Sequence, residues 1–171
     1  RYADVLHTLA FFGKLDRVDF DSFVPTFQKV VRQANEIMKG PPYKRYVFFM
    51  DMGGRAGSLE HLSSVRLSIW SRQGAAVAAL VAHEFFHLWN VKRIRPAALG
   101  PFDYRDPPRT RNLWFAEGVT DYYARVITRR SGMTTEDGFL LGFARSIRAM
   151  AFNPARTRVT ADEASLRVWE T

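Results

Sequence analysis

The stretch VAALVAHEFFHLWN, residues 77–90, places two of the chain's four histidines inside an otherwise apolar run. On a helix, residues four apart share a face, so His83 and His87 can point at one ion. Glu84 follows the first histidine directly, near enough to reach a water on that ion without ligating it. This H-E-x-x-H spacing is typical of a zinc site. The alternative is a set of polar side chains in a buried helix without a metal, which would be costly to desolvate.

A catalytic zinc site needs a third protein ligand and an open position for water. No histidine follows His87, which excludes the pattern with a third histidine downstream. His7 and His61 lie upstream, so a carboxylate is the better candidate. Glu117 stands among apolar and aromatic residues in NLWFAEGVTDYY, residues 112–123. The 29 residues between His87 and Glu117 allow one helix to end and a second to pack against it.

Asp121 lies four residues after Glu117 and therefore on the same face of the predicted helix. Histidine ligands usually donate their second ring N–H to an outer acceptor, and Asp121 could orient one of them in this way. An ion pair with Arg125, a further four residues on, is an equal alternative.

The composition is that of one globular domain. The chain has 171 residues, 47% of them hydrophobic and 14% aromatic. No apolar run reaches the ~18 residues of a membrane span.

The net charge of +8 comes mainly from scattered arginines and short clusters such as residues 92–95. We interpret these basic residues as solvated surface rather than as a nucleic-acid site. There is no visible secretory leader at Arg1. The absence of cysteine excludes thiolate metal sites but leaves the compartment open.

Periodicity and capping signals predict an α+β domain. We expect a small mixed or antiparallel sheet from residues 45–70, packed on the helix that carries the histidines and followed by a mainly helical lobe. The sheet-containing part covers about residues 1–95 and the helical part about 96–171. The predicted elements are helices from Asp19 or Asp21 to about Met38 and over about 74–91, 112–130 and 135–152, strands over 45–52 and 64–70, and a capping box at Thr160 and Glu163.

Three segments carry a resemblance to a known family. GSLEHLSS (57–64), HEFFHLWNVKRIRP (83–96) and LWFAEGVTDYY (113–123) occur in this order along the chain and resemble, in the same order, segments of the glycyl aminopeptidase family of gluzincin zinc metallopeptidases. The resemblance extends from about Asp19 to Trp169. It implies a thermolysin-like gluzincin core, in this case a fragment of the catalytic domain.

The resemblance also implies roles for individual residues. His83, His87 and Glu117 would hold one Zn²⁺ per chain, and Glu84 would be the general base for a zinc-activated water. The substrate would be a peptide with a free N-terminus, preferably beginning with a small residue such as glycine or alanine. Glu60 would hold the α-amine. His61 and Gly57 belong to the same substrate-binding segment. Two alternatives remain: a zinc endopeptidase, and a metal-binding scaffold without catalysis.

The sequence departs from the family pattern in what it does not contain. Related aminopeptidases place a tyrosine well after the third ligand to stabilise the oxyanion, whereas Tyr123 is the last tyrosine here. We therefore expect that tyrosine beyond Thr171. The family further implies an N-terminal β-rich domain and a C-terminal PDZ domain in the full-length protein, and a bacterial cytoplasmic or periplasmic location.

Overall fold

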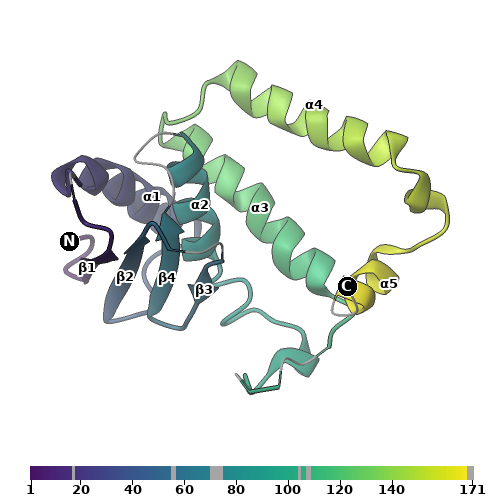
Figure 1. Ribbon diagram of the computed structural model, residues 1–171, viewed down its shortest axis with the longest axis horizontal. Coiled ribbons are helices and arrows are strands. Elements are labelled where there is room, and N and C mark those ends of the chain that lie inside the picture. Colours follow the sequence, from purple (N-terminus) through teal and green to yellow (C-terminus); the bar gives the residue numbers. More distant parts are fainter. Residues whose placement is uncertain (17, 55–56, 70–74, 104, 107–108, 169–171) are drawn as a thin grey trace.

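The structure is a computed structural model that describes residues 1–16, 18–54, 57–69, 75–103, 105–106 and 109–168. Figure 1 shows a small sheet with helices packed on it at one end of the molecule and further helices extending toward the other end. This arrangement confirms the predicted α+β class. The strands are β1 (Leu6–Gly13), β2 (Arg45–Met52), β3 (Leu59–Glu60) and β4 (Ser64–Ile69), and the α-helices are α1 (Val24–Ile37), α2 (Ala75–Phe86), α3 (Leu113–Arg130), α4 (Glu136–Phe152) and α5 (Ala161–Arg167).

The sheet is mixed, with the strand order β1-β2-β4-β3. β1 and β4 both pair with β2 in parallel, and β3 pairs antiparallel with β4 at the edge. The predictions for β2 and β4 are confirmed, although residue 70 lies outside the described residues. β1 was not predicted. It reaches its place beside β2 through a crossover that contains α1, as parallel strands require.

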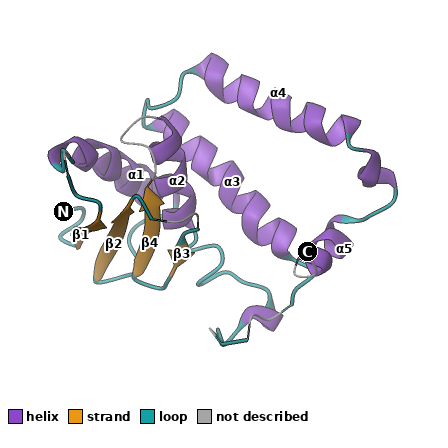
Figure 2. Ribbon diagram, viewed as in Figure 1, coloured by secondary structure: helices purple, strands orange, loops and turns teal. Residues whose placement is uncertain are grey.

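Both α1 and α2 lie on one face of this sheet (Figure 2), and aromatic residues hold them there. Tyr46 and Phe48 of β2 are fully buried on that face, because alternate residues of a strand point the same way. The Phe48 ring centroid lies 4.8 Å from that of Phe27 on α1 and 5.4 Å from that of Phe85 on α2. Since α2 is held between sheet and α3, its histidines stand on a rigid support.

The α-helix that carries the histidines ends earlier than predicted. It was expected to continue to about Val91, but its last residue is Phe86. The chain then continues in wider turns, in which the backbone N–H of Lys92 donates to the His87 carbonyl and that of Ile94 to the Trp89 carbonyl, both across five residues. These turns bring the residues after His87 back toward the histidine ring.

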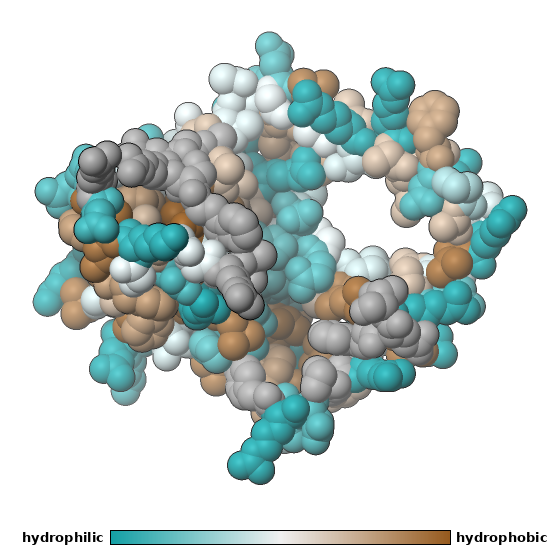
Figure 3. Space-filling view, in the orientation of Figure 1, coloured by the Kyte–Doolittle hydropathy of each residue, from teal (hydrophilic) through white to brown (hydrophobic). Residues whose placement is uncertain are grey.

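The helical part begins with α3, which packs against α2. The Phe86 and Tyr123 rings stack with centroids 4.5 Å apart. α4 has no buried residue, and Figure 3 shows an opening beside it. The predicted capping box at Thr160 and Glu163 is present at the start of α5. No helix among the described residues has the length and apolarity to cross a bilayer.

Candidate metal centre

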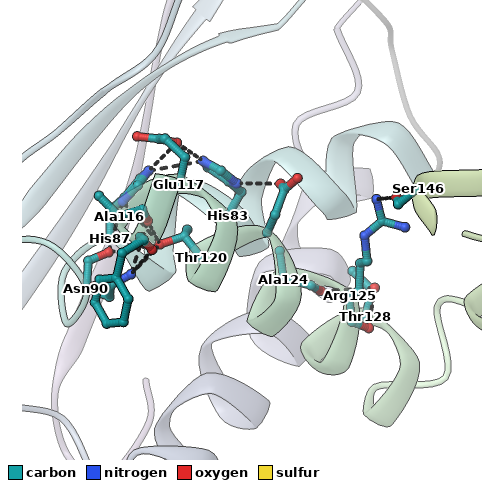
Figure 4. A network of polar contacts seen from close by, with 12 residues as sticks. His83, His87, Asn90, Ala116, Glu117, Thr120, Ala124, Arg125, Thr128 and Ser146 are labelled. Carbon is teal, nitrogen blue, oxygen red and sulfur yellow. Dashed lines mark hydrogen bonds and ion pairs between the residues drawn. The ribbon is translucent and has the colours of Figure 1, made fainter. Parts of the chain in front are cut away.

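Two imidazole nitrogens and one carboxylate oxygen converge between α2 and α3 (Figure 4). The Nε2 atoms of His83 and His87 are 3.0 Å apart. Glu117 Oε2 lies 3.2 Å from His83 Nε2 and 3.6 Å from His87 Nε2. His83 lies in the last turn of α2 and His87 follows its last residue directly, whereas Glu117 comes from the first turns of α3. The structure thus brings together three residues that are distant in sequence.

The second nitrogen of each ring faces an acceptor. His83 Nδ1 is 2.9 Å from Asp121 Oδ1, and His87 Nδ1 is 2.9 Å from the Asn90 carbonyl oxygen. A carbonyl or carboxylate oxygen only accepts, so both Nδ1 atoms carry the proton. In neutral imidazoles the two Nε2 lone pairs then point at each other and at Glu117. Such an arrangement is stable with a cation among the three atoms or with added protons on the rings.

The donor set fits zinc in chemistry and in spacing. Zinc prefers imidazole nitrogen and carboxylate oxygen at about 2.0–2.1 Å, and tetrahedral ligands at that distance are separated by about 3.3 Å. The observed separations of 3.0, 3.2 and 3.6 Å bracket this value. His87 is buried and the His83 side chain is 20% exposed, whereas the Glu117 side chain is half exposed. The exposed side leaves room for a water or a substrate.

Asn90 and Thr120 were missed by the sequence analysis although they support the site directly. The Asn90 side-chain amide donates to the Ala116 carbonyl oxygen at 3.0 Å and to Thr120 Oγ1 at 3.1 Å. The backbone carbonyl oxygen of Asn90 accepts from His87 Nδ1. Asn90 therefore fixes the His87 ring and joins α2 to the residue before Glu117 (Figure 4). The side chains of Asn90 and Thr120 are both buried. The signal in the sequence was Asn90 itself, a polar residue at the end of an apolar run.

The electrostatics follow from this convergence. When the rings of His83 and His87 are protonated on both nitrogens, Nε2 of each donates to Glu117, and these hydrogen bonds lower the pKa of Glu117 to about 2 against the opposing effect of burial. Desolvation lowers the pKa of both imidazoles, but their hydrogen bonds to Glu117 and the surrounding carboxylates outweigh it and the net pKa is raised. Burial raises the pKa of Glu84 in spite of the two nearby imidazoles. Within one site, the pKa of the Glu117 carboxyl is therefore lowered and that of the Glu84 carboxyl is raised.

Glu60 lies close to this group, at the end of the edge strand β3. One carboxylate oxygen each from Glu60 and Glu84 and one ring nitrogen of His87 lie within 4.8 Å of one another. His61 follows in the turn to β4, where its backbone N–H donates to the Ser64 carbonyl at 2.8 Å. Gly57 has a φ of +116°, which favours glycine, and its carbonyl accepts from Ser68 Oγ.

Two residues have surroundings that the sequence did not indicate. His7 lies on β1, with Nε2 2.9 Å from the Tyr43 hydroxyl oxygen, and it is not part of the converging group. The prediction that Lys92 belongs to a solvated basic surface is wrong. Its side chain is only 3% exposed, with Nζ 3.1 Å from Glu60 Oε1. Residues distant in sequence cover it, so the local sequence gave no sign of its burial.

A cavity of about 620 Å³ lies away from this centre. It is bounded mainly by β1 and α1 and includes His7, Phe27 and Arg32. None of the converging metal-site residues lines it. This cavity is therefore separate from the converging side chains at the α2–α3 junction.

Asp121 accepts from His83, whereas the alternative partner Arg125 donates to Ser146 Oγ at 3.2 Å. If Asp121 orients the His83 ring, Asp121→Asn in the full-length protein should lower zinc affinity by about 10- to 100-fold. Competition with a chelating dye measures this affinity. Asp137→Asn, an exposed acid in the first turn of α4, is the matched control and should change nothing. Equal zinc affinities for the wild type and Asp121→Asn would show that Asp121 does not support zinc binding.

Fold and site together define a class: an α+β chain with two imidazoles and a carboxylate converging at a helix junction. The same fold occurs in the crystal structure of an aminopeptidase N family protein from Idiomarina loihiensis, at a TM-score of 0.82 and 22% sequence identity. The match covers 96% of this chain and 31% of that protein, so this chain spans about a third of its length. No curated protein sequence matches the chain.

The model of the M61 glycyl aminopeptidase family matches residues 76–171, more than half of the chain. The chain belongs to this family, which confirms the resemblance indicated by the sequence. The matched region contains the converging imidazoles and Glu117.

Proposed function

We propose that this chain is the zinc-binding catalytic part of an aminopeptidase that removes small N-terminal residues, glycine or alanine, from peptides. One observation carries the proposal. His83 and His87 direct their acceptor nitrogens at Glu117 while both Nδ1 atoms are held by other groups. The family to which the chain belongs and its aminopeptidase-like fold support the same assignment.

The proposal includes a thermolysin-like gluzincin core. The sheet-containing part, residues 1–95, supports the two histidines, and the helical part, 96–171, supplies Glu117. Together they form a single catalytic domain of a longer protein. The N-terminal β-rich and C-terminal PDZ domains, the oxyanion tyrosine beyond Thr171 and a bacterial cytoplasmic or periplasmic location remain predictions from the family.

His83, His87 and Glu117 would hold the zinc. When bound, zinc supplies a Lewis acid that polarises the scissile carbonyl and acidifies the attacking water. Glu84 takes the proton from that water and transfers it to the leaving amine. Asp121 and the Asn90 carbonyl keep the two imidazoles in the tautomer that leaves Nε2 free for the metal.

Glu60 is proposed to bind the substrate's α-amine. Its carboxylate lies beside Glu84 and His87, so an ammonium held there would put the first peptide bond near the general base. His61 and Gly57 in the same segment would line the approach. A fixed carboxylate at this distance selects chains whose N-terminus ends at the site, which is the property of an exopeptidase.

The test compares free and blocked substrates on the full-length protein. Gly- and Ala-p-nitroanilide should be hydrolysed with zinc present, and their N-acetylated forms at least tenfold more slowly, since the amine contributes a charged hydrogen bond. A chelator should abolish the activity, and added zinc should restore it. Equal rates for acetylated and free substrates would instead favour an endopeptidase. Zinc binding without any hydrolysis would favour the scaffold.

A further inference from the structure

Lys92 is a buried cation next to the proposed centre. It follows His87 by five residues, and its backbone N–H donates to the His87 carbonyl at 2.9 Å. The same turns that end α2 therefore attach Lys92 to a proposed zinc ligand. A lysine that is 3% exposed is rare, because desolvating an ammonium is costly unless it is paired.

The contacts of its ammonium group come from segments before and after it in the chain. Nζ lies 3.1 Å from Glu60 Oε1 on the edge strand, and the Glu60 side chain is itself only 20% exposed. Nζ also lies 4.0 Å from the centroid of the Phe102 ring, in the connection between α2 and α3. The aromatic face and the carboxylate together hold the ammonium, so its position is fixed on two sides.

The partner of this lysine borders the reacting groups. Glu60, Glu84 and His87 offer ligand atoms within 4.8 Å of one another, and His87 also belongs to the group with His83 and Glu117. Carboxylates this close repel each other and would turn apart if they were unrestrained. A fixed cation at Oε1 keeps Glu60 in place and leaves its second oxygen for another donor.

We infer that Lys92 is a positioning residue for substrate recognition, holding Glu60 so that Oε2 meets the α-amine of the peptide. This inference rests on the proposed function. Lys92 contacts neither the substrate nor the metal; it acts through Glu60. Preference for a free N-terminus then depends on a pair, Lys92 with Glu60, and not on Glu60 by itself.

The experiment is a double-variant cycle in the full-length, zinc-loaded protein: Lys92→Met, Glu60→Gln, the double variant, and Lys29→Met on the exposed face of α1 as control. With Gly-p-nitroanilide, Lys92→Met and Glu60→Gln should each raise KM by about 10- to 100-fold, the loss of one charged hydrogen bond, with kcat changed only a few-fold, and the control should keep the wild-type KM. The double variant should have the KM of Glu60→Gln, because coupled effects are not additive. Zinc content should stay at that of the wild type in all four.

A merely structural role for Lys92 gives a different pattern. Lys92→Met would then lower Tm without raising KM, or its effect on KM would multiply with that of Glu60→Gln. Either result overturns the inference. If Lys92→Met does not fold, because it leaves a buried carboxylate unpaired, the double variant removes both charges and can be compared with Glu60→Gln directly. A further rise in KM in the double variant would again contradict the inference.

A second readout separates this inference from the proposed function. Glycinamide, a free amine, should bind the wild type more tightly than N-acetylglycinamide in calorimetry, and Lys92→Met should remove the difference. If the wild type hydrolyses no peptide but binds glycinamide, and Lys92→Met loses that binding, the amine site is supported and the aminopeptidase activity is rejected. Hydrolysis by the wild type with an unchanged KM in Lys92→Met would reject the role of Lys92 alone.

Discussion

Glu84→Gln in the full-length protein is expected to lower kcat by about 10²–10⁴-fold, the contribution of a general base. The amide has nearly the same shape but cannot accept the proton of the attacking water. Glu84 contributes none of the three atoms that converge between α2 and α3, so the zinc content of the variant should equal that of the wild type. The measurement is steady-state hydrolysis of Gly-p-nitroanilide beside metal analysis of the same sample.

The matched control for this change is Glu36→Gln, on the exposed surface of α1, where Glu36 pairs with Arg32 at 2.9 Å. This control should keep both turnover and zinc. Undiminished turnover in Glu84→Gln would show that another group is the base. If zinc were lost as well, Glu84 would belong to the metal ligands rather than to the proton-transfer chemistry.

Glu117→Ala should weaken zinc binding by more than about 100-fold, since removal of an outer-shell partner alone costs 10- to 100-fold. Glu117 supplies the only carboxylate oxygen within reach of both Nε2 atoms in the described ligand group His83, His87 and Glu117. Its side chain is half exposed, so its truncation should change the stability of the fold little. A chelator competition titration gives the affinity.

Glu136→Ala is the control for the third ligand. Glu136 lies on α4, its side chain is 72% exposed, and it forms a surface ion pair with Arg129. The Glu136→Ala variant should bind zinc with the affinity of the wild type. A Glu117→Ala variant with wild-type affinity would mean that a different residue completes the site, with Glu60 and Glu84 the next candidates beside His87.

Much of the fold was predictable because the signals were local. Thr160 accepts from the backbone N–H of Glu163 at the start of α5, as its capping pattern predicted, and α4 begins next to Thr135, where a helix was expected to start. The apolar run before His83 predicted a buried helix, and α2 is buried between the sheet and α3. The spacing of His83 and His87 fixes their common face whatever surrounds them.

The remaining features depend on contacts between distant segments. β1 was not predicted because its stability comes from pairing with β2, some forty residues away. The burial of Lys92 depends on Glu60 and Phe102, and the end of α2 depends on how the following turns meet α3. The role of Asn90 as a bridge to Ala116 required the α2–α3 packing to be known.

The measurement that tests the central claim most directly is a crystal structure of the full-length protein with anomalous diffraction at the zinc edge. We predict one anomalous peak per chain, within about 2.0–2.2 Å of His83 Nε2, His87 Nε2 and a Glu117 oxygen. A peak bound by other residues would contradict the account. So would a zinc-soaked crystal with no peak at the α2–α3 junction.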